Sequence, residues 1–140
     1  MNQNQYIDQH RNIKEEIRIL RELLDENFLE NASKIALHIN TLAGKIKIHL
    51  MSEDKYLYPE LQEHSDIKVR HLATSYQREM GMLAQYFAEF KELYNTQSKI
   101  RRNQENCPKD LKAILNMIEK RIEKEEGGLY QIEAIKLHFN

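Results

Sequence analysis

Five residues that can bind a metal ion stand where the sequence pattern otherwise places apolar residues. Apolar residues recur every three or four positions, as on one face of a helix, and histidines or glutamates interrupt this pattern. A carboxylate in a helix-bundle core is costly unless it is paired, hydrogen-bonded or bound to a metal. Imidazole nitrogen and carboxylate oxygen together suit iron, manganese or zinc. The five residues are His10, His49, Glu53, Glu79 and Glu125.

Their spacing brings three of them together. His49 and Glu53 are four residues apart, which places both side chains on one face of a helix. If the first two helices fold about a turn near 28–29, His10 lies about 19 residues before the turn and His49 about 20 after it, at one level. Bundle cores with such ligands hold di-iron and di-manganese sites. From these residues alone, a buried polar network without metal stays open as the alternative.

The elements that must position these residues are four helices. Apolar residues recur at three and four rather than at two, which predicts helices and no strands. Short connections near 28–31 and 62–65 make neighbouring helices antiparallel. The predicted fold is therefore all-α, an antiparallel up-down-up-down four-helix bundle, with a dimer of hairpins as the weaker alternative. The predicted domain is 1–140, a single unit of two helical hairpins at about 5–59 and 65–136.

Several residues mark the expected boundaries and the core-facing seam. Asn31 is a plausible N-cap of the second helix, and Pro59 is expected to end it. Pro108 is expected to open the fourth helix. In the third helix, Leu72 and Glu79 are placed in the core seam.

Composition excludes several classes of protein. The chain has 140 residues and a formal net charge of −1, which indicates neither a nucleic-acid partner nor a membrane surface. The basic run at 99–102 is short and is interpreted as a solvated linker. The lone cysteine, Cys107, rules out a disulfide within the chain and is expected to be an exposed thiol. No long apolar run or leader is evident, so we expect a cytoplasmic protein, a monomer or weak homodimer.

The second and fourth helices carry the same motif. Residues 49–59 align with 121–131, so that glutamate recurs four residues after the first position and Leu-Tyr eight and nine residues after it. Pseudo-twofold symmetry predicts that both motifs lie at the same end of the bundle. The aligned pairs are His49 with Arg121, Glu53 with Glu125, Leu57 with Leu129, and Tyr58 with Tyr130.

The pattern resembles a known family. A histidine in the first helix followed by H-x-x-x-E-D-x-x-L-Y-P is similar to the HHE cation-binding family of hemerythrin-like domains, and R-I-E-K-E-E-G-G-L-Y resembles a bacterial branch of it. The resemblance implies a carboxylate-bridged di-iron centre between the helices. It implies that His10, His49 and Glu53 are ligands from the first hairpin and that Glu125 and His71 are ligands from the second.

Arg121 is the main departure from that family, which has a histidine at this position. Arginine cannot donate a lone pair to a metal. We expect Arg121 to pair with Glu79 or Glu125, leaving one metal, a weakened second metal or none. The glycines at 127–128 each cost a helix roughly 1 kcal/mol relative to alanine, so we expect a bend or fraying just after Glu125.

Three functions follow as hypotheses. The leading one is a non-haem metal-binding module that senses or carries a diatomic gas, peroxide or the metal itself. Iron is the expected metal, mono- or di-nuclear, with manganese or zinc as alternatives. The second is a di-iron oxidoreductase acting on peroxide or nitric oxide, although we expect binding rather than catalysis. The third is a metal-free helical interaction bundle whose polar core fixes helix register.

Overall fold

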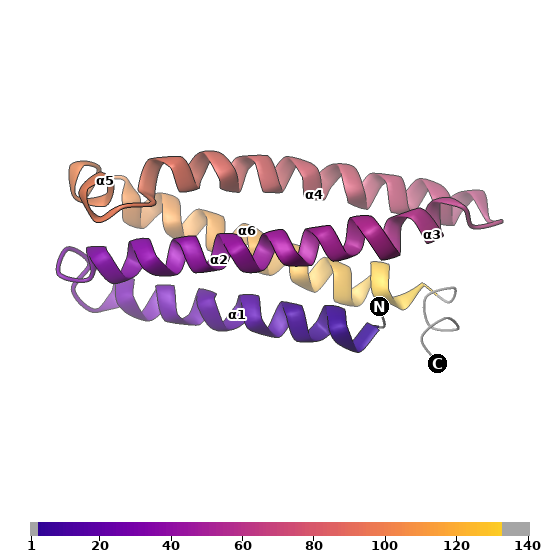
Figure 1. Cartoon of the computed structure of the whole chain (residues 1–140), viewed down its shortest axis with the longest axis horizontal. Helices are drawn as coiled ribbons and strands as arrows, with labels where there is room; N and C mark the ends of the chain where they lie inside the picture. Colours follow the sequence, from indigo (N-terminus) through magenta and orange to yellow (C-terminus); the bar gives the residue numbers. More distant parts are fainter. Residues whose placement is uncertain (1–2, 133–140) are drawn as a thin grey trace.

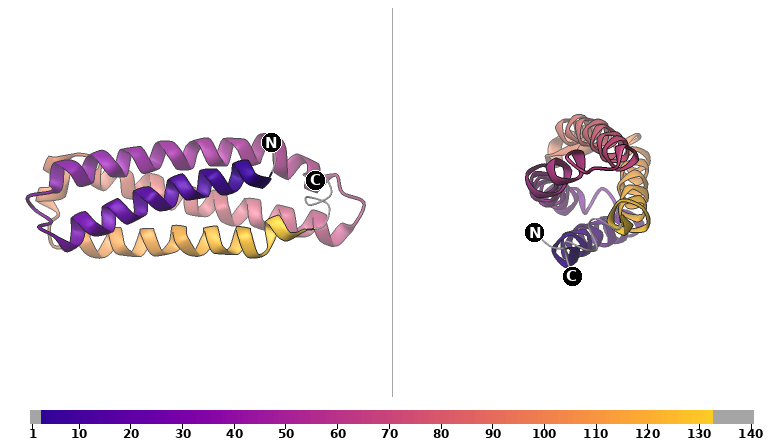
Figure 2. Two further views of the ribbon diagram at one scale, coloured as in Figure 1. Left: turned by 90° about the horizontal axis from the view of Figure 1, so that it is seen from below. Right: turned by 90° about the vertical axis from the view of Figure 1, so that its right-hand side faces the viewer.

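A computed structural model describes residues 3–132 and shows four long antiparallel helices side by side (Figure 1). The end-on view, in the right panel of Figure 2, shows these long helices arranged around a common axis. No strand occurs in the described range, so the all-α prediction is confirmed. None of its helices combines the length and apolar character needed to cross a lipid bilayer. The long helices are α1 (Gln3–Asp25), α2 (Ala32–Ser52), α4 (Ile67–Tyr94) and α6 (Cys107–Gly127).

Each long helix packs against two others. α1 lies against α2 and α6, and α4 lies against the same two helices. Successive long helices run in opposite directions, which gives the up-down-up-down order (Figure 1). The predicted first hairpin corresponds to α1 and α2, and the second to α4 and α6. The predicted end of the second hairpin at residue 136 lies outside the described residues, as do residues 1–2.

The predicted end of the second helix at Pro59 is wrong. The helix widens into a π-helical segment, η1 (Glu53–Leu57), and continues as α3 (Tyr58–Gln62). Within the widened turn the Tyr58 N–H bonds to the Glu53 carbonyl five residues back. Pro59 then falls in the first turn of α3, where a missing N–H costs little, so proline does not stop the helix.

The connection before the fourth helix is more ordered than a solvated linker. It contains the short helix α5 (Gln97–Arg102), where the Thr96 side chain accepts a hydrogen bond from the Lys99 N–H. Ile100 inside the basic run is fully buried. Cys107 is also fully buried, so its expected exposure is wrong. The first turn of α6 packs Cys107 into the main apolar cluster. The polar residues that flank Cys107 in the chain give no indication of this burial.

The expected seam of the third helix is wrong at two positions. Leu72 is 40% exposed and Glu79 is 47% exposed, whereas Ala73, Tyr76 and Met80 face the core. The expected seam with Leu72 and Glu79 and the observed seam with Ala73 and Met80 both alternate steps of three and four residues. Periodicity therefore does not distinguish the two rotations of the helix. The tyrosine rings that pack at this end, with Ala73 buried among them, decide the rotation of α4.

The bundle has two apolar clusters with polar residues between them. The larger cluster extends from the α1–α2 connection to Ile46 and Ile122. The smaller cluster caps the other end of the bundle and contains both Leu-Tyr pairs of the repeat. Its buried members are Tyr6, Leu57, Tyr58, Leu61, Ala73, Tyr76, Leu129 and Tyr130.

Candidate metal centre

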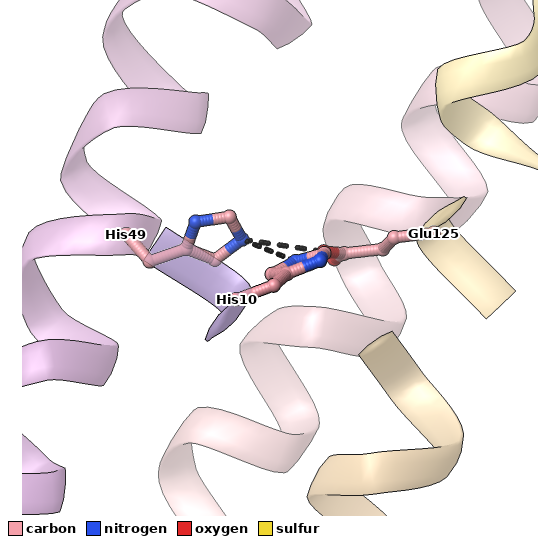
Figure 3. Close-up of side chains that lie close together, drawn as sticks. All are labelled: His10, His49 and Glu125. Carbon is pink, nitrogen blue, oxygen red and sulfur yellow. Dashed lines mark hydrogen bonds and ion pairs between the residues drawn. The ribbon is translucent and has the colours of Figure 1, made fainter. Parts of the chain in front are cut away.

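Three buried side chains from three helices converge in the polar layer. His10 of α1, His49 of α2 and Glu125 of α6 are 1%, 3% and 1% exposed. Their nearest nitrogen and oxygen atoms lie within 4.8 Å of one another (Figure 3). His10 Nε2 is 3.1 Å from His49 Nε2 and 2.8 Å from Glu125 Oε1, and His49 Nε2 is 3.2 Å from the same oxygen. The prediction that His10 and His49 face each other at one level is confirmed.

Glu53 lies beside this cluster and contacts His49, although it is not one of the three residues whose ligand atoms all lie within 4.8 Å of one another. It is the first residue of the widened turn η1 and is fully buried. Its Oε1 lies 3.4 Å from His49 Nε2, while Oε2 accepts a hydrogen bond of 2.7 Å from the Tyr130 hydroxyl. Among the residues that the structure describes, no group other than the distant His49 Nε2 offers a hydrogen to the buried Oε1. A buried carboxylate oxygen without a donor is costly, and a cation at this place would remove the cost.

The outer nitrogens of both imidazoles are held by acceptors. His10 Nδ1 is 2.7 Å from Glu126 Oε2, and His49 Nδ1 is 2.7 Å from Gln9 Oε1. Gln9 in turn donates from Nε2 to the Ser52 hydroxyl at 3.1 Å. These partners accept the Nδ1 protons, which directs the Nε2 atoms of both rings toward the centre of the cluster. Metal-binding histidines are oriented in the same way by outer carboxylate or carbonyl partners.

The donor set therefore fits a metal ion. With Nδ1 donating outward, a neutral imidazole presents a lone pair at Nε2. The two Nε2 atoms and Glu125 Oε1 are then three acceptors that face one another. A proton or a metal cation among them is required to offset their repulsion. In the metal-free chain a proton fills this role. Burial would lower the pKa of His49, but hydrogen bonds and charges from Glu125 and Glu53 outweigh burial and raise it to about 9.

The two carboxylates differ in their protonation. Burial would raise the pKa of Glu125, but hydrogen bonds from His10 and His49 and the charges of His49 and Arg121 hold it far below its ordinary value. Glu125 is therefore ionised. Burial and the nearby charge of Glu125 raise the pKa of Glu53. A divalent or trivalent cation between them would allow both carboxylates to be ionised.

Arg121 occupies the other side of the centre and is paired as predicted. Its Nε donates to Glu125 Oε2 at 2.8 Å, and its Nη1 lies 3.5 Å from Glu79 Oε2. Nη2 donates to the Tyr76 carbonyl at 2.9 Å and to the Tyr58 hydroxyl at 3.2 Å. The guanidinium carbon lies 4.9 Å from the centre of the Tyr76 ring. A fixed positive charge thus stands where the resemblance implies a histidine ligand.

The third helix brings neither of its expected ligands to the cluster. His71 is exposed on α4 and is not a member of the group that can hold a metal among the described residues. Glu79 is half-exposed and bonds to Lys124 at 2.5 Å, so it reaches the centre only through Arg121. Its expected place in the core is wrong because α4 is rotated by one position there. A role of His71 or Glu79 in metal binding stays a prediction.

Tyr130 belongs to the centre, although the spacing of histidines and glutamates does not predict it. Its ring is fully buried, and its hydroxyl lies 3.1 Å from Glu125 Oε1 as well as 2.7 Å from Glu53. Burial and the charges of Glu125 and Glu53 raise the pKa of Tyr130 well above its usual range. The recurrence of Leu-Tyr in both motifs was the available signal. Gln9 and Glu126, which hold the imidazoles, had no distinct signal.

The expected fraying after Glu125 explains how Tyr130 reaches the centre. α6 ends at Gly127, and the chain turns into a short 3-10 segment, η2 (Leu129–Gln131). A Cβ atom at Gly128 would collide with the Tyr76 hydroxyl, which donates to the Lys124 carbonyl at 3.1 Å. Glycine at this position therefore permits the close packing of the turn on Tyr76.

The two repeated motifs meet at one end of the bundle, as predicted. Each tyrosine contacts the first residue of the other motif: Tyr58 contacts Arg121, and Tyr130 lies 3.4 Å from His49 Nε2. Each hairpin thus places its tyrosine against the motif of the other hairpin, in a pseudo-twofold arrangement. Only the half that contains His49 presents nitrogen ligands.

Comparison with known proteins agrees with this geometry. A family model described as hemerythrin HHE cation binding domain matches residues 3–132. No curated protein and no solved structure gives a match. The matched range and the buried histidine and glutamate cluster together fit a metal-binding module.

Proposed function

Because the chain belongs to the hemerythrin HHE cation-binding domain family, we propose that it holds one non-haem iron ion and senses or carries a diatomic gas, peroxide or the metal itself. Bound iron would supply the reactivity toward such small ligands. Iron is favoured over manganese and zinc as the expected metal of the family, and all three accept the same ligand types. The proposed ligands are His10, His49, Glu53 and Glu125.

One observation carries the proposal. The Nε2 atoms of His10 and His49 and Glu125 Oε1 lie 2.8–3.2 Å apart in a buried layer while both outer ring nitrogens are engaged elsewhere. An apolar bundle gains no stability from converging three acceptors, since each one needs a donor or a cation when buried. A site built for a cation accounts for this convergence.

A single metal position follows from Arg121. A guanidinium is always protonated in proteins and cannot act as a ligand. It lies 2.8 Å from Glu125 Oε2, so its charge already neutralises the side of that carboxylate facing away from the histidines. We therefore propose one ion on the His10 and His49 side, with Arg121 in place of a second.

The chain's own residues would orient and shield the ion. Glu126 and Gln9 fix the imidazole rings, and the two apolar clusters on either side of the polar layer exclude water. We also propose that the whole chain forms one domain of two hairpins, because both hairpins contribute side chains to the centre. A reducing compartment such as the cytoplasm is proposed because the single cysteine, Cys107, is free and buried. The proposed oligomeric state is a monomer or weak homodimer.

The test is metal analysis of protein expressed in iron-replete medium, followed by optical titration. We expect one iron ion per chain and an absorption band that shifts when oxygen or nitric oxide is added. Steady turnover of peroxide or nitric oxide with a supplied reductant would instead indicate an oxidoreductase. Absence of iron, manganese and zinc, with unchanged thermal unfolding after addition of each metal, would leave the metal-free bundle and contradict the proposal.

A further inference from the structure

We propose that Tyr130 is an additional ligand of the metal ion and binds it through the phenol oxygen. This inference rests on the proposed metal-binding function and extends it to a residue outside the histidine and glutamate set. The side chain comes from η2, beyond the end of the fourth helix.

The position of the hydroxyl is the first argument. Its oxygen lies 2.7 Å from Glu53 Oε2 and 3.1 Å from Glu125 Oε1. It also lies 3.3 Å from His10 Nε2 and 3.4 Å from His49 Nε2. One oxygen is thus within 3.4 Å of an atom from each of the four proposed ligands. The hydroxyl is therefore close enough to all four residues to join them in binding one ion.

The balance of donors and acceptors is the second argument. A phenol has one hydrogen to donate and lone pairs on the same oxygen. The shortest contact, to Glu53 Oε2, uses that hydrogen. Around the hydroxyl the two Nε2 atoms and Glu125 Oε1 are also acceptors when the imidazoles are neutral. One phenol hydrogen cannot serve all of these acceptors, and a cation among them would meet the shortfall.

The ring is held rigidly in this orientation. Tyr130 is fully buried, and its ring stacks on Tyr6 with centroids 5.5 Å apart and on His10 with centroids 5.4 Å apart. The turn at Gly128, two residues before Tyr130, packs closely against Tyr76 and positions the backbone that leads to Tyr130. A ligand held by its neighbours in the metal-free chain binds with little reordering.

Tyr58 supplies an internal comparison. It is the counterpart of Tyr130 in the repeated motif and is equally buried, at 1% exposed. Its hydroxyl accepts a hydrogen bond of 3.2 Å from Arg121 Nη2 instead of meeting the histidines. The two tyrosines therefore differ in their surroundings and not in burial, which makes Tyr58 a matched control.

The chemistry of ligation balances. The O–H bond breaks, its proton passes to solvent, and the oxygen forms a bond to the ion with no change in oxidation state. Tyrosinate is an established protein ligand of ferric iron. Two carboxylates and one phenolate carry three negative charges, and the Arg121 guanidinium offsets part of the charge of Glu125. The remaining negative charge stabilises a trivalent ion more than a divalent one. The ligand set is therefore expected to favour ferric over ferrous iron.

Ferric loading with optical detection tests the inference. Phenolate bound to ferric iron gives a charge-transfer band in the visible region, which imidazole and carboxylate ligands do not. We expect this band in the unmodified chain and in Tyr58→Phe, and its loss in Tyr130→Phe. Iron content by metal analysis and helical circular dichroism are measured on the same samples. Resonance Raman spectra of the unmodified chain, excited in the band, should show enhanced tyrosinate ring modes.

The outcomes separate this inference from the proposed function. Iron in the unmodified chain without the band or the tyrosinate modes would overturn the role of Tyr130 and leave the metal site intact. A band that persists in Tyr130→Phe would overturn it as well, and a band lost only in Tyr58→Phe would assign it to the other tyrosine. No bound iron in the unmodified chain would overturn both proposals.

Discussion

Arg121 donates from Nε to Glu125 Oε2 at 2.8 Å, one helical turn along α6, while the corresponding pair on the second helix joins His49 to Glu53 at 3.4 Å. The same i,i+4 geometry thus carries an ion pair in one hairpin and two metal-compatible groups in the other. Arg121 therefore contributes an ion pair to the stability of the bundle at the position where His49 contributes a proposed metal ligand.

Arg121→Leu is expected to destabilise the metal-free protein by about 3–5 kcal/mol, because it removes the arginine partner of the buried Glu125 Oε2. Urea unfolding followed by circular dichroism measures the loss. Glu79→Gln is the control. Glu79 is 47% exposed, so its pair with Arg121 contributes less than about 1 kcal/mol. Equal stability of Arg121→Leu and the unmodified chain would show that the guanidinium is dispensable.

Arg121→His restores the H-x-x-x-E pattern beside Glu125 and should raise the iron content or the iron affinity. An imidazole there offers a lone pair where the guanidinium offers none. Iron per chain, from metal analysis after anaerobic loading, is the measurement. Arg121→Gln removes the charge without adding an imidazole and should bring no such gain. If both variants bind the same amount of iron, the histidine position does not limit the second metal.

Gly127→Ala and Gly128→Ala should shift stability in opposite directions. A Cβ at 127 meets nothing within 4 Å, so alanine should stabilise the helix end by up to about 1 kcal/mol. A Cβ at 128 collides with the Tyr76 hydroxyl and should destabilise by about 1–3 kcal/mol. Thermal unfolding of the two variants decides the matter, and a stabilised Gly128→Ala would refute the packing described for this turn.

The Cys107 thiol should react slowly in the folded protein. Burial and the charge of Asp110 raise the pKa of Cys107 from 9.0 to about 12. Between these values the unfolded chain releases the thiol proton and the folded chain retains it, so this residue makes the protein less stable as pH rises. Alkylation at pH 9 should be slow in buffer and fast in denaturant. Equal rates would mean that the thiol is exposed.

The sequence was sufficient for the bundle and for most of the buried centre. Three-four periodicity located all four long helices, and counting residues from the first turn placed His10 opposite His49. These inferences depend on spacing within regular helices, which the chain obeys. The ion pair of Arg121 was also predictable, since a buried guanidinium requires a carboxylate partner.

The remaining features depend on local packing that spacing does not encode. Glu79 and Met80 are equally consistent with the periodicity of α4, and large tyrosine rings at that end decide between them. The widened turn at Glu53 carries the helix past Pro59. Tyr130 reaches the centre because the chain leaves helical geometry after Gly127, and no helical pattern extends to that point.

The most direct test of the metal centre is iron content in three single variants expressed in iron-replete medium. His49→Ala and Glu53→Ala should each lose most or all of the bound iron and keep a helical circular dichroism spectrum, because both side chains are buried at the centre. His71→Ala, on the exposed face of α4, should keep the iron content of the unmodified chain. Full iron content in both His49→Ala and Glu53→Ala would contradict the placement of the site.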